Sequence, residues 1–406
     1  MQQILDRKAA IKLSKEEMEE YQGPTQYITH HPVLKESVTT PVRMVTNSSF
    51  NNGGRSLNSC LAAGPNSLNR MLDVLLRFRC HECGMQYDLS KAYNTLRTGI
   101  KERHLRRFVW KFHDDHDWED FAFDCVHFGD RCAATQLEVG KDLAADAGEQ
   151  IDPEAATRIK EDTYVDDGVT GGTKEQVSRF IGNKTENGTF DGTMPQILSK
   201  GNFKVKTMTF SGDSDQSQID LLGSNVFGYT WHVTEDKMAV KFPVNLSKKR
   251  RSVRSEPNMT VNDLEKLRTV KLSKRKLLGF VNGIGDPLGI GSPWYMKLKL
   301  LMKKLYLLES PLSWDEEIPA SNKEDWITVM TEALLEGTLE FPRSTRPANA
   351  LGRGPLVVGF GDGGVPGFGG NVYLQWQLKC SHDGDCWSLY VQGQDMPSER
   401  LHCAQE

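Results

Sequence analysis

Apolar residues recur at helical spacing just after a turn-rich amino-terminal stretch. The segment SLNRMLDVLLRFR at 67–79 has apolar side chains at 68, 71, 72, 75, 76 and 78, which predicts a helix with one buried face and Ser67 as its N-cap. The next segment, GMQYDL at 84–89, predicts a short strand, and SKAYNTLRTG continues it as a helix. The pattern therefore predicts a strand that carries an acid, Asp88, near its end.

Strand and helix patterns then alternate as far as residue 210. In chain order they are paired strands at 106–112 and 121–128, an alanine-rich helical pattern at 133–160, two short strands, DTYV and GVTG, around Asp166-Asp167, a helix at 173–182, a Gly/Asn/Thr-rich linker at 183–194 and a strand at 203–210. From 84 to 210 this β-α-β-β-α-β order predicts an α+β fold with a split βαβ, ferredoxin-like antiparallel sheet and helices on one face.

The sequence pattern changes twice in the second half of the chain. A helical pattern that begins near residue 275 is interrupted at Gly285-Asp286-Pro287 and resumes from 294. Beyond Pro342, glycine-rich strand patterns such as LVVGFGDGG and GGNVYLQWQLK predict a separate small domain from about 354 to 406. A chain of 406 residues has room for two or three domains of ~100–200 residues each.

Composition describes an ordinary globular protein. Hydrophobic residues make up 38% and charged residues 26% of the chain, and no apolar run approaches the ~18 residues of a membrane span. The amino terminus carries charges at Asp6, Arg7 and Lys8, so it lacks the apolar core of a signal peptide. The eight cysteines are scattered, which suits reduced thiols. We therefore expect an intracellular protein without a membrane partner.

Positive charge is concentrated in one part of a chain whose net charge is −4. Residues 241–304 hold 16 Lys and Arg against 4 Asp and Glu. Within them, SKKRRSVR (247–254) and KLSKRK (271–276) have enough cations to follow a phosphate backbone. This basic zone fits a nucleic-acid partner, and a solvated loop or a nuclear-import patch is the alternative.

Three carboxylates carry the clearest chemical signal. Asp88 stands at the end of one predicted strand, and Asp166 and Asp167 stand in a hairpin turn further along the chain. On adjacent strands of one antiparallel sheet they would converge, and hard oxygen ligands of this kind suit Mg²⁺. Two such ions would activate an attacking hydroxyl and stabilise a leaving pyrophosphate in an in-line displacement. The alternative is that Asp-Asp-Gly is only a turn-forming tripeptide.

The residues around these acids resemble a known family. YVDD at 164–167, with DLSKAY at 88–93 upstream, is similar to the catalytic core of reverse transcriptases. HHPVLKESVTTPVRMVTNSS, HFGDRCAATQLEVGKDLA and DPLGIGSPWYMKLKLLMKKL, in this order, resemble the polymerase of BEL/Pao retrotransposons. The resemblance runs from about residue 24 to the end of the chain. It implies a right-hand polymerase, with a partial amino-terminal segment at 1–23, fingers and palm at 24–235, a basic thumb or connection at 236–345 and a truncated RNase H-like α/β domain at 354–406.

The resemblance also implies roles for single residues near the acids. Asp88 and Asp166 would bind two Mg²⁺ ions, for which Mn²⁺ can substitute, and Asp167 would support them. Tyr93 falls where the family has an aromatic gate that excludes the 2′-hydroxyl of a ribonucleotide, although its spacing equally fits a core tyrosine. Lys206, in FKVK, matches a lysine that protonates the leaving pyrophosphate as a general acid, or it is a surface residue of its strand.

Further residues match the part of the family that holds the nucleotide. Lys35 and Arg43 fall in finger strands that bind the triphosphate in the family. The alternative interpretation is that both are exposed cations without this role. Phe128 and Gly129 match the segment that packs under the templating base pair. Ala134 departs from the family, because related elements often carry proline there.

The end of the chain resembles the first strands of an RNase H domain. Asp362, in GFGDGG, would be its first metal ligand, with a glycine-rich turn as the alternative, and Glu399 would be its second acid. We expect this domain to be truncated and inactive, because its remaining acids would lie beyond Glu406. The region after 277 also resembles a segment that carries a Pao-type peptidase name, although the sequence contains no Asp-Ser/Thr-Gly triplet.

The sequence as a whole predicts an RNA-directed DNA polymerase. Its partners would be an RNA or DNA template with a primer and deoxynucleoside triphosphates, in a cytoplasmic particle or in the nucleus. A non-catalytic nucleic-acid-binding remnant of a truncated polyprotein is the main alternative, and a metal phosphohydrolase that uses the same acids is a weaker one. The oligomeric state stays open.

Overall fold

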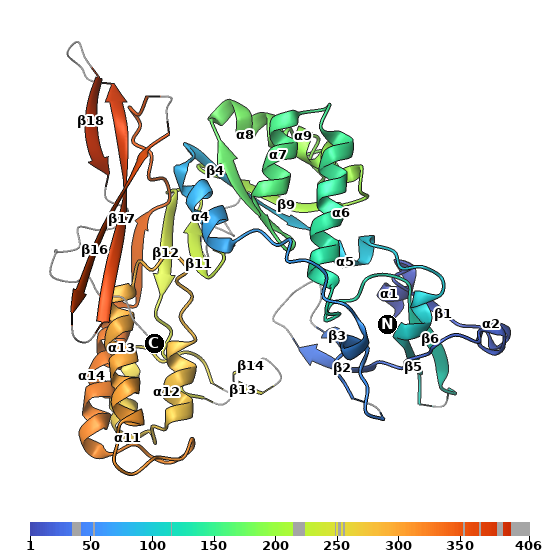
Figure 1. Cartoon of the computed structure of the whole chain (residues 1–406), viewed down its shortest axis with the longest axis horizontal. Coiled ribbons are helices and arrows are strands. Elements are labelled where there is room, and N and C mark those ends of the chain that lie inside the picture. Colours follow the sequence, from blue (N-terminus) through green and yellow to red (C-terminus); the bar gives the residue numbers. More distant parts are fainter. Residues whose placement is uncertain are drawn as a thin grey trace.

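The computed structural model describes residues 1–406 apart from 35–41, 52, 115, 214–223, 248, 251–252, 255, 352–353, 365–366, 380–384 and 391–406. The elements form three groups along the molecule (Figure 1). The amino-terminal elements lie at one end, a helix-covered sheet lies in the middle, and the long carboxy-terminal strands and helices lie at the other end. The fold is mixed α and β with antiparallel sheets.

The middle group is built on a four-stranded antiparallel sheet in the order β7-β8-β4-β9. Its strands are β4 (Cys83–Leu89), β7 (Thr163–Tyr164), β8 (Asp167–Gly172) and β9 (Val205–Phe210). The first strand in the chain lies between the third and the fourth, and the second lies at the edge. This is the strand order of a split βαβ unit, as the succession of patterns predicted.

Helices cover one face of this sheet. They are α6 (Ala133–Gly148), α7 (Pro153–Glu161), α8 (Lys174–Ile181) and α9 (Thr193–Ser199). Met85 and Tyr87, alternate residues of β4, point into a core with side chains from these helices. The single helical pattern expected at 133–160 forms two helices, because Asp152 caps a new helix that has Pro153 in its first turn. Helix α9 begins inside the expected 183–194 linker.

The other face of the sheet packs against the carboxy-terminal group. It contacts α4 (Met71–Cys80), which begins four residues after the predicted cap Ser67. Val74 and Phe78 of α4 and Val169 of β8 join the largest core, together with Trp231 and Trp326. The elements of that group are the sheet β10 (Ser224–Val226), β11 (Tyr229–His232), β12 (Lys237–Lys241) and β15 (Thr338–Pro342), and the helices α11 (Leu264–Thr269), α12 (Lys274–Val281), α13 (Ser292–Tyr306) and α14 (Ala320–Glu336).

The sheet of this group continues across a predicted domain boundary. Strand β12 pairs with β11 on one side and with β15 on the other. The boundary expected between residues 235 and 236 therefore falls in the turn between two paired strands. The break at Gly285-Asp286-Pro287 lies, as predicted, between α12 and α13.

The amino-terminal group contains two small sheets. The hairpin predicted from 106–112 and 121–128 is present, and residues near the amino terminus add a third strand to it, in the order β1-β6-β5. Residues 10–12 of the segment 1–23 are thus part of this sheet. The elements are β1 (Ala10–Lys12), β5 (Arg107–Trp110) and β6 (Glu119–Phe123), the pair β2 (Thr29–Leu34) and β3 (Val42–Asn47), the helices α1 (Gln2–Asp6), α2 (Lys15–Glu20), α3 (Leu57–Cys60) and α5 (Ala92–Thr95), and a 3₁₀ turn, η1 (Glu102–Arg106).

The glycine-rich strands predicted beyond Pro342 form an antiparallel sheet in the order β16-β17-β18. They are β16 (Leu356–Gly364), β17 (Gly367–Lys379) and β18 (Asp385–Tyr390). The remaining short elements are the ribbon β13 (Lys249–Arg250) and β14 (Val253–Arg254) and the 3₁₀ turn η2 (Val261–Asp263). No helix in the described part of the chain is both long and apolar enough to cross a membrane.

Candidate active site

Two of the predicted acids lie opposite each other in the central sheet. Asp88 on β4 is the register partner of Asp167 on β8. Directly opposite residues of an antiparallel pair project from the same face, so both carboxylates lie on one side of the sheet. From the other neighbouring strand, β9, Lys206 Nζ donates to Asp88 Oδ2 at 2.9 Å. Three adjacent strands thus supply two acids and one cation to one place.

The third acid, Asp166, lies at the tip of the turn between β7 and β8. Tyr164 is opposite Asp167 in the register, so Val165 and Asp166 make a two-residue turn. Val165 has a φ of +60°, which is a rare conformation for a β-branched residue. Backbone strain of this kind persists only where its surroundings hold it, and it concentrates at functional sites.

Gly168 lets this hairpin lie against the sheet. A Cβ at position 168 would lie 2.1 Å from ring atoms of Tyr87, which is far inside van der Waals contact. The Tyr87 ring is itself fully buried in the core under the helices. The glycine of Asp-Asp-Gly is therefore required by the packing of β8 on β4.

A buried carboxylate holds the base of the same hairpin. Asp162, just before β7, accepts hydrogen bonds from Arg77 Nε and Thr170 Oγ1, each at 2.5 Å, and Arg158 lies 3.6 Å away. Its backbone carbonyl accepts from the Val169 N–H. A buried acid with charged hydrogen-bond partners is strongly held. The turn that carries Asp166 is consequently anchored to α4, α7 and β8.

Negative charge accumulates around this turn. Burial, followed by the charges of Asp166 and Asp88, raises the pKa of Asp167 to about 6. Burial also raises the pKa of Asp166, and Arg43 is one of the cations that oppose this shift. Burial and the charge of Asp166 raise the pKa of Tyr93 to about 12. Like charges that raise one another's pKa create a place where a cation is favoured.

The three acids fit a magnesium site in their chemistry but are not assembled as one. Carboxylate oxygens are the ligands that Mg²⁺ prefers, and the raised pKa of Asp167 reflects a local excess of negative charge. Among the described residues, however, no three His, Cys, Asp or Glu side chains are grouped closely enough to hold a metal ion. Asp88 is instead paired with Lys206.

The structure brings Tyr93 and Phe128 together beside the acids. Tyr93 lies on the short helix α5, and its ring meets the Phe128 ring edge-on with centroids 5.6 Å apart. Tyr93 is half-buried, whereas Phe128 is 65% exposed. The neighbouring residue Gly129 has a φ of +108°, a conformation that favours glycine.

Polar contacts brace the loop that carries Phe128 and Gly129. Asn58 Nδ2 donates to the Gly129 carbonyl at 3.0 Å, and Asn58 Oδ1 accepts from the Arg131 N–H. Asp130 is buried between Ser48 and Arg106, with bonds of 2.7 Å to each. These contacts tie the loop to the chain after β3, so a proline at position 134 is not needed to fix its ends.

The other predicted site residues come from separate parts of the chain. Arg43 lies on β3, close enough to act on the pKa of Asp166. Asp362 lies on an exposed part of β16, where its carboxylate accepts the N–H of Gly363. Lys35 and Glu399 lie outside the described residues.

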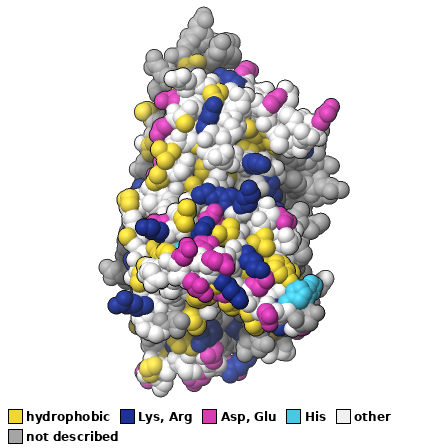
Figure 2. Space-filling view, turned by 90° about the vertical axis from the view of Figure 1, so that its right-hand side faces the viewer, with side chains coloured by type: hydrophobic (Ala, Val, Ile, Leu, Met, Phe, Trp, Pro, Cys, Tyr) yellow, Lys and Arg dark blue, Asp and Glu magenta, His cyan; other side chains and the backbone are white. Residues whose placement is uncertain are grey.

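Part of the basic zone at 241–304 is neutralised by ion pairs. Lys297 pairs with Glu332 at 2.9 Å, and Lys304 pairs with Asp325 at 3.0 Å. These pairs join α13 to α14 along the chain's carboxy-terminal helices. The local excess of positive charge counted from the sequence therefore overstates the field that this region presents. Figure 2 views the molecule from the end formed by the amino-terminal elements, and on that face basic, acidic and apolar side chains lie interspersed.

A pair of functional candidates was missed from the sequence. Glu138 and Lys141, one helical turn apart on α6, are 2% and 0% exposed and form an ion pair of 3.0 Å. The spacing i, i+3 in a helix usually indicates a surface pair. The apolar residues Leu137 and Ala144 around them, which are buried in the same core, were the one available signal.

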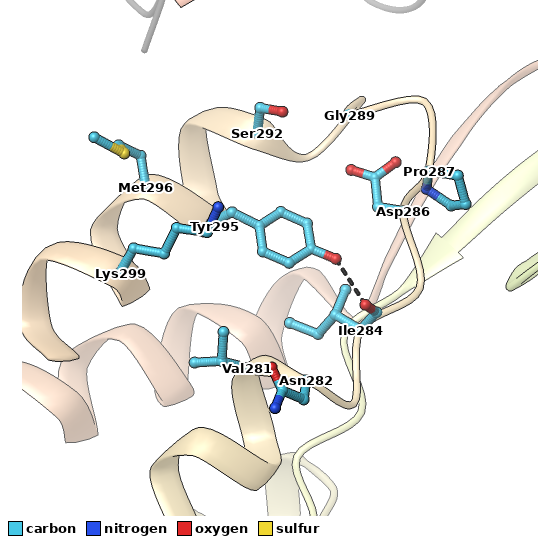
Figure 3. A pocket seen from close by; sticks show the side chains of 10 residues that line it. All are labelled: Val281, Asn282, Ile284, Asp286, Pro287, Gly289, Ser292, Tyr295, Met296 and Lys299. Carbon is cyan, nitrogen blue, oxygen red and sulfur yellow. Dashed lines mark hydrogen bonds between the residues drawn. The ribbon is translucent and has the colours of Figure 1, made fainter. Parts of the chain in front are cut away.

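A separate cavity of about 610 Å³ lies between α12, α13 and their connecting loop (Figure 3). Its carboxylate, Asp286, accepts hydrogen bonds from the Tyr229 hydroxyl and from the N–H groups of Ile290 and Gly291. The Tyr295 hydroxyl donates to the Ile284 carbonyl at 3.0 Å. These bonds build the loop between the two helices and leave Asp286 committed to a structural role.

The fold and the site define a mixed α/β protein whose antiparallel central sheet carries a cluster of acids at a strained hairpin. Residues 273–385 match the family described as Pao retrotransposon-like RNaseH-like domain. The match supports an origin in a Pao-type retrotransposon polyprotein, and an RNase H-like domain in this part of the chain. The region for which the sequence suggested a Pao-type peptidase name thus matches a family that carries an RNaseH-like description.

The matched segment is placed differently from the expected RNase H-like domain. The match begins before α12 and includes the helices α12–α14 as well as β16 and β17. The glycine-rich strand pattern of the sequence instead predicted that the RNase H-like domain starts near residue 354. The strands that carry Asp88, Asp166 and Asp167 lie outside the match. No curated protein matches the chain.

Proposed function

We propose that the chain is the RNA-directed DNA polymerase of a Pao-type retrotransposon. The observation that carries the proposal is the pairing of Asp88 with Asp167 across a split βαβ sheet, with Asp166 at the tip of the adjoining strained turn. A sheet of this kind with acids on adjacent strands suits nucleotidyl transfer from a deoxynucleoside triphosphate to a primer 3′-hydroxyl. The Pao-type family match gives the same origin for the chain.

The acids would hold two Mg²⁺ ions, with Asp88 and Asp166 as ligands of both and Asp167 in support, and Mn²⁺ can replace them. Bound ions supply activation of the attacking hydroxyl and stabilisation of the leaving pyrophosphate. Lys206, which holds Asp88 in this structure, would turn to the pyrophosphate and give it a proton as a general acid. Most of the rate would come from positioning and electrostatics, as in phosphoryl transfer generally.

Tyr93 and its neighbours would hold the nucleotide. The exposed Phe128 ring and the Gly129 backbone offer an apolar surface and close approach for the templating base pair. Tyr93, whose ring contacts Phe128 and whose pKa is raised by the charge of Asp166, would limit the space at the 2′ position of the sugar. Arg43, with Lys35, would contact the triphosphate.

The larger regions would then take the roles that the resemblance implies. Residues 24–235 would be fingers and palm, and 236–345 would be a thumb or connection that contacts an RNA or DNA template with its primer. The sheet of β16–β18 would belong to the RNase H-like region, whose family match begins at residue 273, with Asp362 as its first acid and Glu399 as its second. Such a protein would work in a cytoplasmic particle or in the nucleus.

A non-catalytic nucleic-acid-binding remnant is the second candidate. It is favoured by the pairing of Asp88 with Lys206, and by the absence among the described residues of a group of acids close enough to hold an ion. In that case the fold would bind a template-primer duplex without extending it.

Incorporation of labelled deoxynucleotide on poly(rA)·oligo(dT) with Mg²⁺, run beside Asp166→Asn, tests the proposal. We expect incorporation by the wild type and its loss in the variant, with template-primer binding retained by both. Equal incorporation by the two proteins would remove the acids from the mechanism. Binding without incorporation by either would favour the remnant.

A further inference from the structure

The cavity between α12 and α13 is lined by polar side chains that the described part of the protein does not use. Its acid, Asp286, is already occupied by the Tyr229 hydroxyl and two backbone N–H groups. Lys299 and Ser292 also line the cavity, and among the described residues their side chains have no ion pair or hydrogen bond. Lys299 lies on the other side of the Tyr295 ring from Asp286 (Figure 3). The cavity therefore offers one cation and one hydroxyl to a bound molecule.

The walls of the cavity are largely apolar. Ile284 and Met296 are both buried. The Tyr295 hydroxyl is held by the Ile284 carbonyl at 3.0 Å, so Tyr295 presents its ring to the cavity rather than its hydroxyl. A volume of about 610 Å³ is typical of sites that hold small organic molecules. This lining fits a flat apolar molecule with one anionic group, which Lys299 and Ser292 would bind.

The loop that forms one wall of the cavity packs against the turn between β10 and β11. This turn is Phe227-Gly228. A Cβ placed on Gly228 would lie 3.1 Å from the Cα of Gly285, so the two backbones are in contact. The Tyr229 hydroxyl, directly after the turn, donates to Asp286 and accepts a loop N–H at 2.9 Å. A displacement of the loop is therefore passed on to the turn.

The same turn contacts the hairpin of the candidate active site. The Phe227 ring meets the Tyr164 ring edge-on, with centroids 5.6 Å apart. Tyr164 directly precedes the Val165-Asp166 turn and pairs with Asp167. Phe227 has a φ of +49° and Val165 a φ of +60°, both rare for residues with a Cβ. Two strained turns thus meet through one pair of rings.

Hydrogen bonds also join this turn to the strand of Asp88. Gln86 Nε2 donates to the Asn225 carbonyl at 2.9 Å, and Gln86 Oε1 accepts from Ser224 Oγ at 2.6 Å. Asn225 Oδ1 in turn accepts the Gly228 N–H at 3.2 Å. Because side chains alternate along a strand, Gln86 lies on the same face of β4 as Asp88. The turn is consequently held by both strands that carry the acids.

We propose that the cavity is a regulatory binding site for a small aromatic molecule with one anionic group, and that its occupancy acts on the β7–β8 hairpin through the Phe227-Gly228 turn. Binding stands on the cavity alone, whereas an effect on nucleotide addition rests on the proposed function. Packed interiors transmit displacement because they contain few voids. A molecule bound against Tyr295 and Lys299 would fix the loop at 284–291, so the turn and the hairpin would open less often.

Binding of anilinonaphthalene sulfonate, an aromatic anion that fluoresces in apolar surroundings, to the full chain tests the site. We expect saturable binding by the wild type. Lys299→Met should bind the probe about tenfold more weakly, because it loses one charge-assisted hydrogen bond. Ser292→Phe should abolish binding by filling the cavity. Lys303→Met is the matched control, because Lys303 is an exposed lysine of the same helix outside the cavity lining, and it should bind as the wild type does.

Equal binding by all of these proteins would place the probe elsewhere and overturn the site. Near-ultraviolet circular dichroism and urea unfolding establish that each variant is folded. Lys299→Met, a change at an exposed position, decides the test where Ser292→Phe does not fold.

Hydrogen exchange of residues 162–170, with and without the probe, tests the coupling. In the wild type the probe should slow exchange in the hairpin several-fold. Phe227→Leu keeps an apolar side chain but loses the ring contact with Tyr164, so it should bind the probe and show no slowing. Unchanged exchange in the wild type with the probe bound would overturn the coupling.

Primer extension with and without the probe separates this inference from the proposed function. An active wild type that adds nucleotide at the same rate with the probe bound would overturn the regulatory role alone. A wild type that adds no nucleotide, although the probe binds and slows exchange in the hairpin, would overturn the proposed function and leave the binding site in place.

Discussion

Replacement of Asp167 by asparagine should stabilise the ion-free protein even though it removes a residue of the proposed active site. Asp167 lies opposite Asp88 and next to Asp166, and burial with these two charges raises its pKa from 3.8 to about 6. Because the folded pKa is above the unfolded one, folding favours the protonated form. The associated stability is complete below the unfolded pKa and is lost as the pH rises through about 6.

The size of the effect follows from this shift. A rise from 3.8 to about 6 corresponds to roughly 3 kcal/mol at 1.36 kcal/mol per unit. Asp167 keeps some contact with water, so solvent screening reduces the expected gain to about 1–2 kcal/mol. The asparagine side chain has nearly the same shape and carries no charge at any pH. The gain should therefore be complete at about pH 8 and roughly half as large at about pH 5, which lies between the unfolded and the folded pKa of Asp167.

Urea unfolding in the presence of EDTA measures this difference. Wild type and Asp167→Asn are compared at about pH 8 and about pH 5, with Asp114→Asn as a control, because Asp114 is a fully exposed acid in a turn. We expect the control to change stability by less than about 0.5 kcal/mol at either pH. A variant that is no more stable than wild type at the higher pH, or that gains equally at both, would refute the description of a crowded carboxylate cluster.

Three further changes test neighbouring parts of the site. Gly168→Ala should destabilise the protein by about 2–3 kcal/mol in urea unfolding, because the new Cβ would overlap the Tyr87 ring, and an unchanged midpoint would contradict the close packing of β8 on β4. Tyr93→Ala should allow ribonucleotides to be added by the active enzyme, and unchanged discrimination in a competition assay against deoxynucleotides would exclude a gate. Lys206→Met should slow nucleotide addition by about 10²-fold or more, with Lys204→Met, just before the same strand, as the control, and equal rates in the two variants would exclude a general acid at 206.

The strand order of the central sheet was accessible from the sequence because each signal was local. Asp88 ends a short apolar strand, and the turn at Val165-Asp166 is bounded by β-formers and a glycine, so both strands could be placed. The split βαβ order makes β4 and β8 neighbours, whereas the register that pairs Asp88 with Asp167 is seen only in the structure. The sequence also contains a signal for the boundary between α6 and α7, because Asp152-Pro153 is typical of a helix start. The prediction missed this boundary because the alanine-rich pattern continues on both sides of it.

Features that depend on distant parts of the chain were not accessible. β12 and β15 pair although about a hundred residues separate them, so no local pattern indicates that one sheet crosses residue 235. Helix α9 is seven residues long and owes its stability to packing of Met194 and Ile197 in the core, which propensity does not reveal. Lys141 was missed for the same reason, because only the fold shows that its face of α6 is buried.

Extension of a primer on a defined RNA template tests the central claim most directly. The full chain is given Mg²⁺, a primer annealed to a heteropolymeric RNA and one deoxynucleoside triphosphate at a time. The proposed function predicts that the primer grows by one residue only with the nucleotide complementary to the next template base, and that Asp166→Asn abolishes this growth. A primer that stays unextended while the duplex is bound, or triphosphate that is hydrolysed without a template, would contradict an RNA-directed polymerase.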